Sequence, residues 1–225
     1  MKTIEMTFAQ NRYHIREAFN SLRTNILFSG KDVKTILITS CVAHEGKTTV
    51  ALELSRSLVQ IGKKVLFIDA DLRNSNIVAK RTKERDLTGL SQLLSGQAEI
   101  ADAIYQTQLE GLHIIFAGPQ PPNPTELLEN AVFAELIEGK RDDYDYIIID
   151  AAPLGLVIDA AIMAPLCDGA VMVINTGHIK YREAQRVQDQ LKKTGVRILG
   201  AVLNQTSRKA RKHEKDAYNY GEDKK

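Results

Sequence analysis

Short apolar segments rich in β-branched residues alternate with longer segments of helical periodicity through the middle of the chain. The segment Thr35–Thr39 reads Thr-Ile-Leu-Ile-Thr, which predicts a short buried strand. After a polar loop, apolar residues recur at every third or fourth position over Thr48–Ile61, which predicts a helix. Gly62 follows it, as expected of a residue that ends a helix.

The same alternation continues towards the C-terminus. Further strands are predicted at Lys64–Asp69, Leu112–Ala117, Tyr146–Asp150, Gly169–Asn175 and Arg197–Leu203, and further helices at Pro124–Glu138 and His178–Thr194. Unbroken apolar strands that alternate with helices form parallel sheets covered on both faces, so we expect an α/β fold with a doubly wound, mainly parallel sheet. We expect one domain over residues 35–206, a helical N-terminal extension over 1–34 and a flexible tail over 207–225.

The loop after the first strand ends in Gly46-Lys47-Thr48, the end of a phosphate-binding P-loop. In such a loop, backbone N–H groups and the helix N-terminus point at phosphates, a lysine reaches the β and γ oxygens, and a hydroxyl coordinates Mg²⁺. Cys41 stands where the strict pattern has its first glycine, and Gly-Lys-Thr alone is a common tripeptide. Its position between a strand and a helix favours a nucleotide site over a surface lysine at a helix start.

Three aspartates are predicted at the carboxyl ends of two buried strands. Asp69 and Asp71 end one strand and Asp150 ends another. Ligands of open α/β sheets bind at this edge, so the three carboxylates are expected beside the P-loop. Phosphoryl transfer needs carboxylates that hold Mg²⁺ and one that orients or deprotonates the nucleophile. Aspartate is also common where strands pass into loops, but three at matching strand ends favour a phosphoryl-transfer site.

The composition is that of an ordinary globular protein and points to no further class of function. The chain has 225 residues, of which 44% are hydrophobic and 26% charged, as in ordinary soluble proteins, and its formal charge of +2 demands no nucleic acid. Two unpatterned cysteines predict no disulfide framework and fit a reducing cytosol. The apolar region Tyr146–Asn175 is cut by Asp150, Asp159 and Asp168 into stretches too short to span a membrane, and Met1–Phe19 has no signal-peptide core. We therefore expect a soluble protein.

With these motifs the chain resembles the bacterial tyrosine kinases (BY-kinases) of capsule and exopolysaccharide systems. These are P-loop enzymes akin to the septum-site and partition ATPases. Nearly the whole chain takes part, with Walker motifs at His44–Thr48, Phe67–Arg73 and Ile147–Pro153. The most specific parts are Asp69–Arg73 and the Pro122-Asn123-Pro124 segment. The resemblance implies the P-loop NTPase fold of that group, with ATP and Mg²⁺ as cofactors.

The resemblance also implies roles for the residues at the matching positions. The catalytic set is Lys47, Asp69, Asp71, Asp150 and Arg73; the nucleotide-binding set is Glu45, Gly46, Lys47, Thr48, Thr49 and Asn204; the metal set is Thr48, Asp71 and Asp150. Asp69 orients the incoming tyrosine hydroxyl or accepts its proton. For Arg73, a salt bridge to a neighbour is the alternative, and for Asn204, which matches an adenine-recognising position, a turn asparagine is the alternative.

In the family, a C-terminal tyrosine cluster is phosphorylated by a neighbouring subunit, and here Tyr218 and Tyr220 occupy that place. The alternative is two tyrosines on a disordered end. The N-terminal assembly motif is matched by Glu17 and Arg23, but Asn20 replaces its first arginine, which leaves ring assembly open. His44 stands where relatives usually have glycine; if the position needs positive φ, the histidine is strained.

The family further implies partners and a location. We expect a membrane adaptor whose cytoplasmic end activates the kinase, a cognate tyrosine phosphatase, homo-oligomers, and recruitment from the cytoplasm to the inner face of the membrane. The basic residues before the C-terminus form either a solvated tail or an electrostatic tether to an acidic partner or anionic lipid; they are Arg208, Lys209, Arg211, Lys212 and Lys215.

Two other functions compete with a tyrosine autokinase that controls polysaccharide synthesis or export. One is a partition or septum-site ATPase switch, and the other is a nucleotide-binding regulator with little catalysis. Val42 stands where the partition ATPases carry an early P-loop lysine, and this favours the kinase. Because of His44 and Asn20, the nucleotide-binding regulator remains an alternative.

Overall fold

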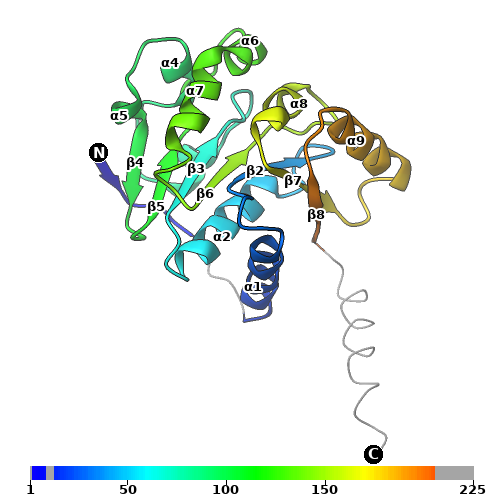
Figure 1. Ribbon diagram of the computed structural model, residues 1–225. Helices are drawn as coiled ribbons and strands as arrows, with labels where there is room; N and C mark the ends of the chain where they lie inside the picture. Colours follow the sequence, from blue (N-terminus) through cyan, green and yellow to red (C-terminus); the bar gives the residue numbers. More distant parts are fainter. Residues whose placement is uncertain (1, 9–12, 206–225) are drawn as a thin grey trace, which may run out of the picture.

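The computed structural model describes residues 2–8 and 13–205, and its centre is one eight-stranded sheet. The strands are β1 (Lys2–Ile4), β2 (Thr35–Ser40), β3 (Val65–Asp69), β4 (Ile104–Thr107), β5 (Leu112–Ile115), β6 (Tyr146–Asp150), β7 (Gly169–Asn175) and β8 (Ile198–Asn204). Their order across the sheet is β1-β4-β5-β3-β6-β2-β7-β8 (Figure 1). All neighbouring strands are parallel except β4 and β5.

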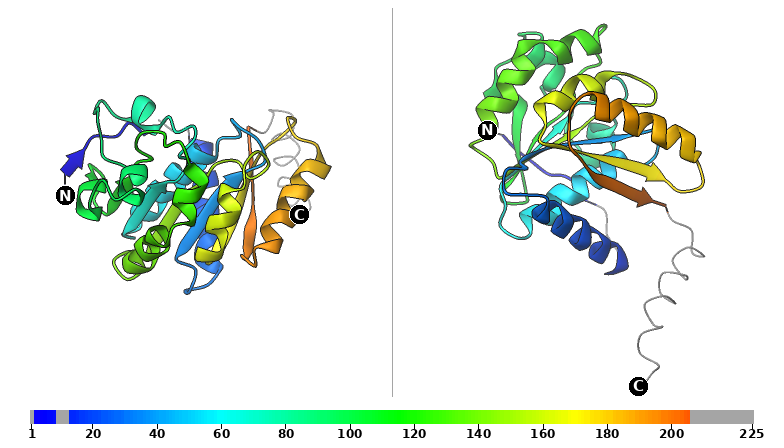
Figure 2. Two further views of the ribbon diagram at one scale, coloured as in Figure 1. Left: turned by 90° about the horizontal axis from the view of Figure 1, so that it is seen from above. Right: turned by 45° about the vertical axis from the view of Figure 1, so that its right-hand side comes forward.

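Helices cover both faces of this sheet (Figure 1, Figure 2). They are α1 (Tyr13–Phe28), α2 (Lys47–Val59), α3 (Ile77–Arg81), α4 (Leu90–Leu94), α5 (Ile100–Ala103), α6 (Pro124–Glu129), α7 (Ala131–Lys140), α8 (Asp159–Met163) with the 3-10 turn η1 (Ala164–Leu166), and α9 (Tyr181–Lys193). Side chains of β2 alternate between two cores: Ile36 and Ile38 pack with α1 and α2, whereas Leu37 packs with α7, α8 and α9. The expected doubly wound, mainly parallel α/β fold is confirmed.

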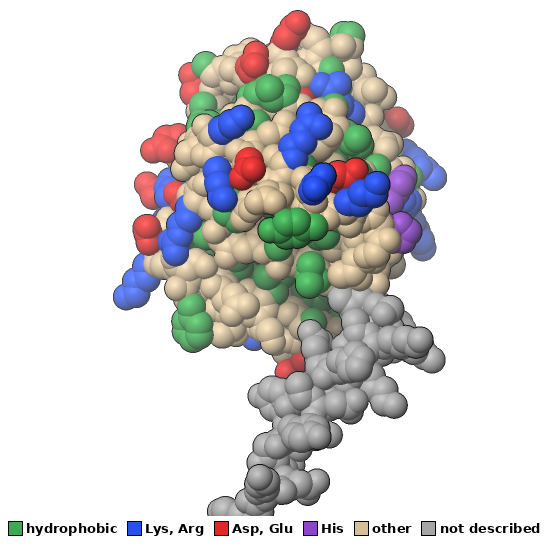
Figure 3. Space-filling view, turned by 90° about the vertical axis from the view of Figure 1, so that its right-hand side faces the viewer, with side chains coloured by type: hydrophobic (Ala, Val, Ile, Leu, Met, Phe, Trp, Pro, Cys, Tyr) green, Lys and Arg blue, Asp and Glu red, His purple; other side chains and the backbone are tan. Residues whose placement is uncertain are grey.

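The outer helix α9 has one face buried against the sheet and one face exposed to solvent. Val187 and Leu191 are buried against the sheet, while Arg182 and Arg186 are exposed on the other face. Figure 3 shows the side of the molecule that carries α9 and β8, where lysine and arginine side chains are scattered around small apolar patches. None of the helices in the described part of the chain combines the length and apolarity that a membrane span requires.

Two expected elements differ in the structure. The single helix expected over Pro124–Glu138 is two helices, because Asn130 has an extended backbone and its side chain accepts a hydrogen bond from Val132 N at 3.2 Å, which starts α7 anew. The N-terminal extension does contain helix α1, but residues 2–4 form the edge strand β1 beside β4. Ile4 in β1 is buried in the core, so this segment belongs to the sheet and not to a separate helical extension.

Parallel register places the carboxyl ends of the central strands together. Asp69 at the end of β3 pairs directly with Asp150 at the end of β6, and β2, which leads into the P-loop, lies on the other side of β6. The edge of the sheet where these three strands end is therefore the place where a site can form. The expected acceptor tyrosines, Tyr218 and Tyr220, lie outside the described residues.

Candidate nucleotide site

The P-loop between β2 and α2 is braced from within by a buried carboxylate. Glu45 is 1% exposed, and its Oε2 accepts hydrogen bonds from Cys41 N at 2.6 Å and Val42 N at 2.8 Å. Its Oε1 accepts from Asn175 N at the end of β7, at 2.9 Å. The side chain of Glu45 therefore fixes the loop's shape, and its place in the nucleotide-binding set stays a prediction.

Two residues of this loop have left-handed backbone. Gly46 has φ 88° and His44 has φ 64°, so the strain expected for a histidine at a glycine position is present. Gly46 is also crowded, since a Cβ built there would lie 2.1 Å from Nδ2 of Asn204. That nitrogen donates to the Glu45 carbonyl at 2.9 Å, so Asn204 closes over the loop from the end of β8. Recognition of adenine by Asn204 stays a prediction.

Cys41, the other departure from the P-loop pattern, has a structural explanation. Its side chain is 1% exposed within the core, and a Cβ on Gly155 would lie 2.0 Å from its carbonyl oxygen. Burial, with Glu45 adding to it, raises the pKa of the Cys41 thiol to about 12. The residue therefore packs as a small apolar side chain and stays protonated at neutral pH.

Lys47 joins the P-loop to the aspartates. Its Nζ lies 2.8 Å from Asp71 Oδ2 and 3.9 Å from Asp150 Oδ1, and its side chain is 11% exposed. Burial by itself lowers the pKa of Lys47, but Asp150 and Asp71 outweigh it and the pKa is raised. The ammonium group is therefore charged and held between two carboxylates.

The carboxylates outnumber the cation that neutralises them. Asp150 is fully buried, and neither of its oxygens has a hydrogen-bond partner among the described residues. Asp69 beside it accepts from the Ser75 hydroxyl and from Asp71 N. Burial first, and then Asp150, raise the pKa of Asp69 to about 8, and burial raises the pKa of Asp150 as well. Lys47 is thus shared between Asp71 and Asp150, and a buried carboxylate without a hydrogen bond is costly, so this site favours a further cation.

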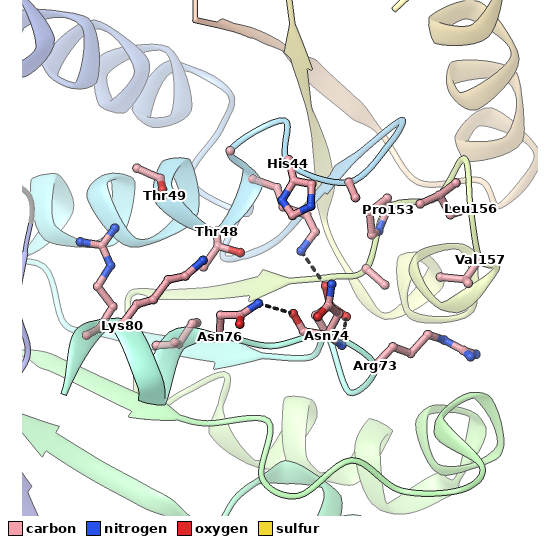
Figure 4. A pocket seen from close by; sticks show the side chains of 17 residues that line it. His44, Thr48, Thr49, Arg73, Asn74, Asn76, Lys80, Pro153, Leu156 and Val157 are labelled. Atoms are coloured by element: carbon pink, nitrogen blue, oxygen red, sulfur yellow. Dashed lines mark hydrogen bonds and ion pairs between the residues drawn. The ribbon is translucent and has the colours of Figure 1, made fainter. Parts of the chain in front are cut away.

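A cavity of about 270 Å³ opens beside these groups, between the P-loop, the β3–α3 segment and the β6–α8 loop (Figure 4). Of the expected site residues, Gly46, Lys47, Thr48, Thr49, Asp71 and Arg73 line it, whereas Glu45, Asp69, Asp150 and Asn204 are not among its lining residues. Pro153, Leu156 and Val157 form an apolar wall, and Lys80 of α3 lies across from it.

Arg73 lines the cavity but its guanidinium is engaged elsewhere. Its Nε and Nη2 donate to the two carboxylate oxygens of Asp159 at 2.7 and 3.0 Å, and Nη2 also donates to Thr125 Oγ1 at 2.7 Å. The structure therefore shows the salt bridge that was one of the two alternatives for Arg73. Sequence reasoning missed Asp159 as a partner, although an aspartate inside an apolar run was a signal that a buried cation must meet it.

The residues expected in assembly lie on α1. Arg23 donates from Nη1 to the carbonyl and the hydroxyl of Ser57, both at 3.0 Å, which attaches α1 to α2. Glu17 accepts from Asn20 Nδ2 at 3.1 Å on the exposed face of the helix. Arg23 thus has a contact within the subunit, and a role in assembly for Glu17 and Arg23 stays a prediction.

Comparison with known proteins agrees with this geometry at the level of the fold. The chain matches the AAA domain family over residues 33–198. It is 32% identical to the septum site-determining protein MinD of Pyrococcus horikoshii OT3, solved with Mg-ADP, with a TM-score of 0.65 over 78% of this chain and 71% of that one. The fold and the loop define a P-loop NTPase of the septum-site ATPase group.

Proteins that are more similar to this chain identify which kind of P-loop NTPase it is. The tyrosine-protein kinase CpsD of Streptococcus agalactiae is 43% identical over 205 residues, which are 91% of this chain and 89% of the relative. The crystal structure of the chimerical protein CapA2B2 is 31% identical with a TM-score of 0.82, over 92% of this chain and 94% of that one. The chain belongs to the bacterial protein-tyrosine kinases of capsule systems, the BY-kinases, and its reaction is phosphoryl transfer to tyrosine.

Proposed function

We propose that this protein is an ATP- and Mg²⁺-dependent autokinase that phosphorylates Tyr218 and Tyr220 in the tail of a neighbouring copy. The observation that carries the proposal is the position of Lys47, at the start of α2 and between Asp71 and Asp150. A buried lysine that two carboxylates keep charged is suited to exchange one of them for the γ-phosphate when nucleotide enters. A lysine that only stabilised the fold would not need to line an open cavity.

The remaining groups support an in-line transfer. The tyrosine oxygen attacks the γ-phosphorus, the bond to the β,γ-bridging oxygen breaks, and ADP leaves while Lys47 neutralises the transferred charge. The tyrosine proton passes to the carboxylate of Asp69, which lies at the end of β3 and pairs with Asp150 at the end of β6. Ser75, which donates to Asp69, holds that carboxylate in place.

Mg²⁺ would be held by Thr48, Asp71 and Asp150. The oxygens of Asp150, which accept no hydrogen bond from the described residues, fit this assignment, because a divalent ion would neutralise the buried charge. When bound there, the ion would supply positive charge that offsets the negative charge of the phosphates during transfer. The described residues contain no cluster of three or more acidic, histidine or cysteine side chains that would cage a metal, and none is needed, since water and phosphates supply most Mg²⁺ ligands at nucleotide sites.

The partners follow from the same proposal. We infer that a membrane adaptor activates the kinase and recruits it from the cytoplasm to the inner face of the membrane, and that a cognate phosphatase resets the tail. Phosphorylation would then regulate capsular or exopolysaccharide synthesis or export. Self-association through α1 would bring a tail to a neighbour's site, and the exposed position of Glu17 is compatible with such a contact.

Mass-spectrometric mapping of phosphotyrosine tests the proposal. The full chain is incubated with ATP, Mg²⁺ and the adaptor's cytoplasmic segment, and we expect phosphate on Tyr218 and Tyr220. Lys47→Met should abolish labelling, whereas Tyr218→Phe with Tyr220→Phe should keep nucleotide binding. Hydrolysis of ATP without formation of phosphotyrosine would overturn the proposed autokinase and would favour an ATPase switch.

Mixing two variants tests transfer between copies. The Lys47→Met variant has acceptor tyrosines but no working site, and the Tyr218→Phe/Tyr220→Phe variant has a working site but no acceptors. Phosphotyrosine on the Lys47→Met chain can form only in trans. If the wild-type protein labels itself at a rate independent of its concentration and the mixture stays unlabelled, transfer is within one chain.

A further inference from the structure

One cation of the cavity has no assigned task. Lys47 is paired with Asp71, Arg73 is paired with Asp159, and Arg81 donates to the Thr7 carbonyl at 3.3 Å. Lys80 lines the same cavity and is exposed, and its ammonium group forms no hydrogen bond or ion pair with the described residues. Figure 4 shows its side chain extending from α3 toward Thr48 at the start of α2. Within the described part of the chain, the Lys80 ammonium group therefore has no partner and lies at the rim of the cavity, on the side of Thr48.

The opposite side of the cavity is apolar. Pro153 and Leu156 come from the β6–α8 loop, and Leu156 is 60% exposed although it is a large aliphatic side chain. An exposed leucine next to a cavity offers a surface on which an aromatic ring can pack. The cavity thus has an apolar wall on one side and the ammonium group of Lys80 on the other, and Lys47 and Asp71 also line it.

The acceptor segment has the complementary composition. Asp216–Asp223 contains Tyr218 and Tyr220 together with the carboxylates of Asp216, Glu222 and Asp223, and it contains no lysine or arginine. The rest of the tail is strongly basic, so this acidic segment stands out from its surroundings in the sequence. A tyrosine flanked by carboxylates would fit its ring to the apolar wall and its flanking charge to Lys80.

We propose that Lys80, with the neighbouring positive charge of Arg81, is a specificity-determining residue that selects tyrosines flanked by carboxylates. The inference rests on the proposed function, since it concerns which tyrosines that kinase accepts. An ion pair at the rim of a cavity acts mainly on selection and on encounter with the partner, and salt weakens it. The expected preference is therefore moderate, about fivefold, and it decreases as ionic strength rises.

A charge exchange between enzyme and acceptor tests the inference. The enzyme is the Tyr218→Phe/Tyr220→Phe chain, with or without Lys80→Glu. The acceptor is the Lys47→Met chain with either its natural tail or a basic tail carrying Asp216→Lys, Glu222→Lys and Asp223→Lys. The measured quantity is the ratio of phosphotyrosine formation on the two tails by the same enzyme, so any effect on nucleotide binding cancels.

We expect the enzyme with Lys80 to label the acidic tail about fivefold faster than the basic tail, and the Lys80→Glu enzyme to reverse that preference. Lys80→Met should bring the ratio close to one. Lys83→Glu is the matched control, because Lys83 is exposed just beyond α3 but does not line the cavity, and it should keep the ratio of the enzyme with Lys80.

Three outcomes would overturn the inference in different ways. Equal labelling of both tails by the Lys80 enzyme would show that the site ignores flanking charge. An unchanged ratio in Lys80→Glu would show that selection comes from another residue. Absence of label on either tail with every enzyme would overturn the proposed function itself, and this inference with it.

Discussion

The guanidinium of Arg73 and the carboxylate of Asp159 form a two-point ion pair, with N–O distances of 2.7 and 3.0 Å, that joins the segment after β3 to the start of α8. Asp159 is fully buried, and its second contact is the hydroxyl of Thr125 at 3.0 Å, at the start of α6. Three loops at the carboxyl edge of the sheet thus meet at one carboxylate. The pair lies two residues from Asp71 and therefore fixes the segment that supplies a proposed metal ligand.

Arg73→Ala should lower both stability and phosphotransfer. The change leaves a buried carboxylate with only a hydroxyl partner, which should cost about 3 kcal/mol in the free energy of unfolding. The rate should fall about tenfold or more, since residues that orient metal ligands have effects of that size. Urea unfolding of Arg73→Ala, Asp159→Ala and the double variant should show strong coupling, with the double variant more stable than the sum predicts.

The same set distinguishes positioning from direct action on the phosphates. If Arg73 acts through Asp159, both single variants lose activity to a similar extent. Loss of activity in Arg73→Ala alone, with Asp159→Ala fully active, would instead support the role in charge stabilisation implied by the family.

Glu45→Gln should disturb the P-loop without touching a phosphate contact. The carboxylate accepts three backbone N–H groups from inside the protein, and an amide nitrogen would face at least one of them. We expect a loss of about 2 kcal/mol in stability. Calorimetry should also show weaker MgADP binding, by about tenfold, because the loop loses its preorganised shape. Glu135→Gln on the exposed face of α7 is the matched control. If the two variants had equal stability and equal affinity for MgADP, Glu45 would not brace the P-loop.

His44→Gly should stabilise the protein. At φ 64° a non-glycine residue is strained, whereas glycine adopts this conformation freely, so a gain of about 0.5–1 kcal/mol is expected. His44→Val should lose about 1–2 kcal/mol, because a β-branched side chain tolerates left-handed backbone least. Chemical denaturation measures both; identical stability of the glycine and valine variants would show that the loop relaxes out of this conformation.

Asp168 should make stability depend on pH. Burial raises its pKa, but the hydrogen bond from Arg141 Nη2 at 2.7 Å and those from the backbone of Thr35 and Lys34 together outweigh burial, and the pKa is lowered. A carboxylate with a lowered folded-state pKa contributes stability above its unfolded pKa of about 4, and that contribution is lost as pH falls through the folded pKa.

Asp168→Asn should therefore cost about 1 kcal/mol at pH 7, a modest value because the pair is partly solvated. The difference from the wild-type protein should shrink below about pH 4. Unfolding free energies measured from pH 7 down to pH 3.5 test this, and a difference that stays constant over that range would contradict the assignment.

Periodicity identified the central strands and their helices because each repeats a local pattern several times. The strand β6 was predicted with its observed bounds, since four apolar or aromatic residues in a row before Asp150 leave little choice. The edge strand β1 was missed because it has three residues and only one of them is buried. The break at Asn130 was missed because a helix cap depends on one local hydrogen bond, here from Val132 N to the Asn130 side chain, and this bond leaves no periodic pattern in the sequence.

The candidate site, too, could be predicted only in part. The Gly-Lys-Thr sequence and the strand-end aspartates could be found from local sequence alone, because strand ends and helix starts have local signatures and parallel topology brings them to one edge. The sequence did not show which aspartate contacts Lys47 and which contacts Arg73, because these contacts join segments 24 and 86 residues apart in the chain.

By itself, the sequence determined the α/β class, the P-loop and the residue types available for phosphoryl transfer, since these depend on periodicity and on short motifs. Only the tertiary structure decided that Glu45 braces the loop, that Arg73 pairs with Asp159, and that the Lys80 side chain lies at the cavity rim without a partner among the described residues. The physical reason is that a buried charge must find its partner wherever packing places one, and distance along the chain does not specify that partner.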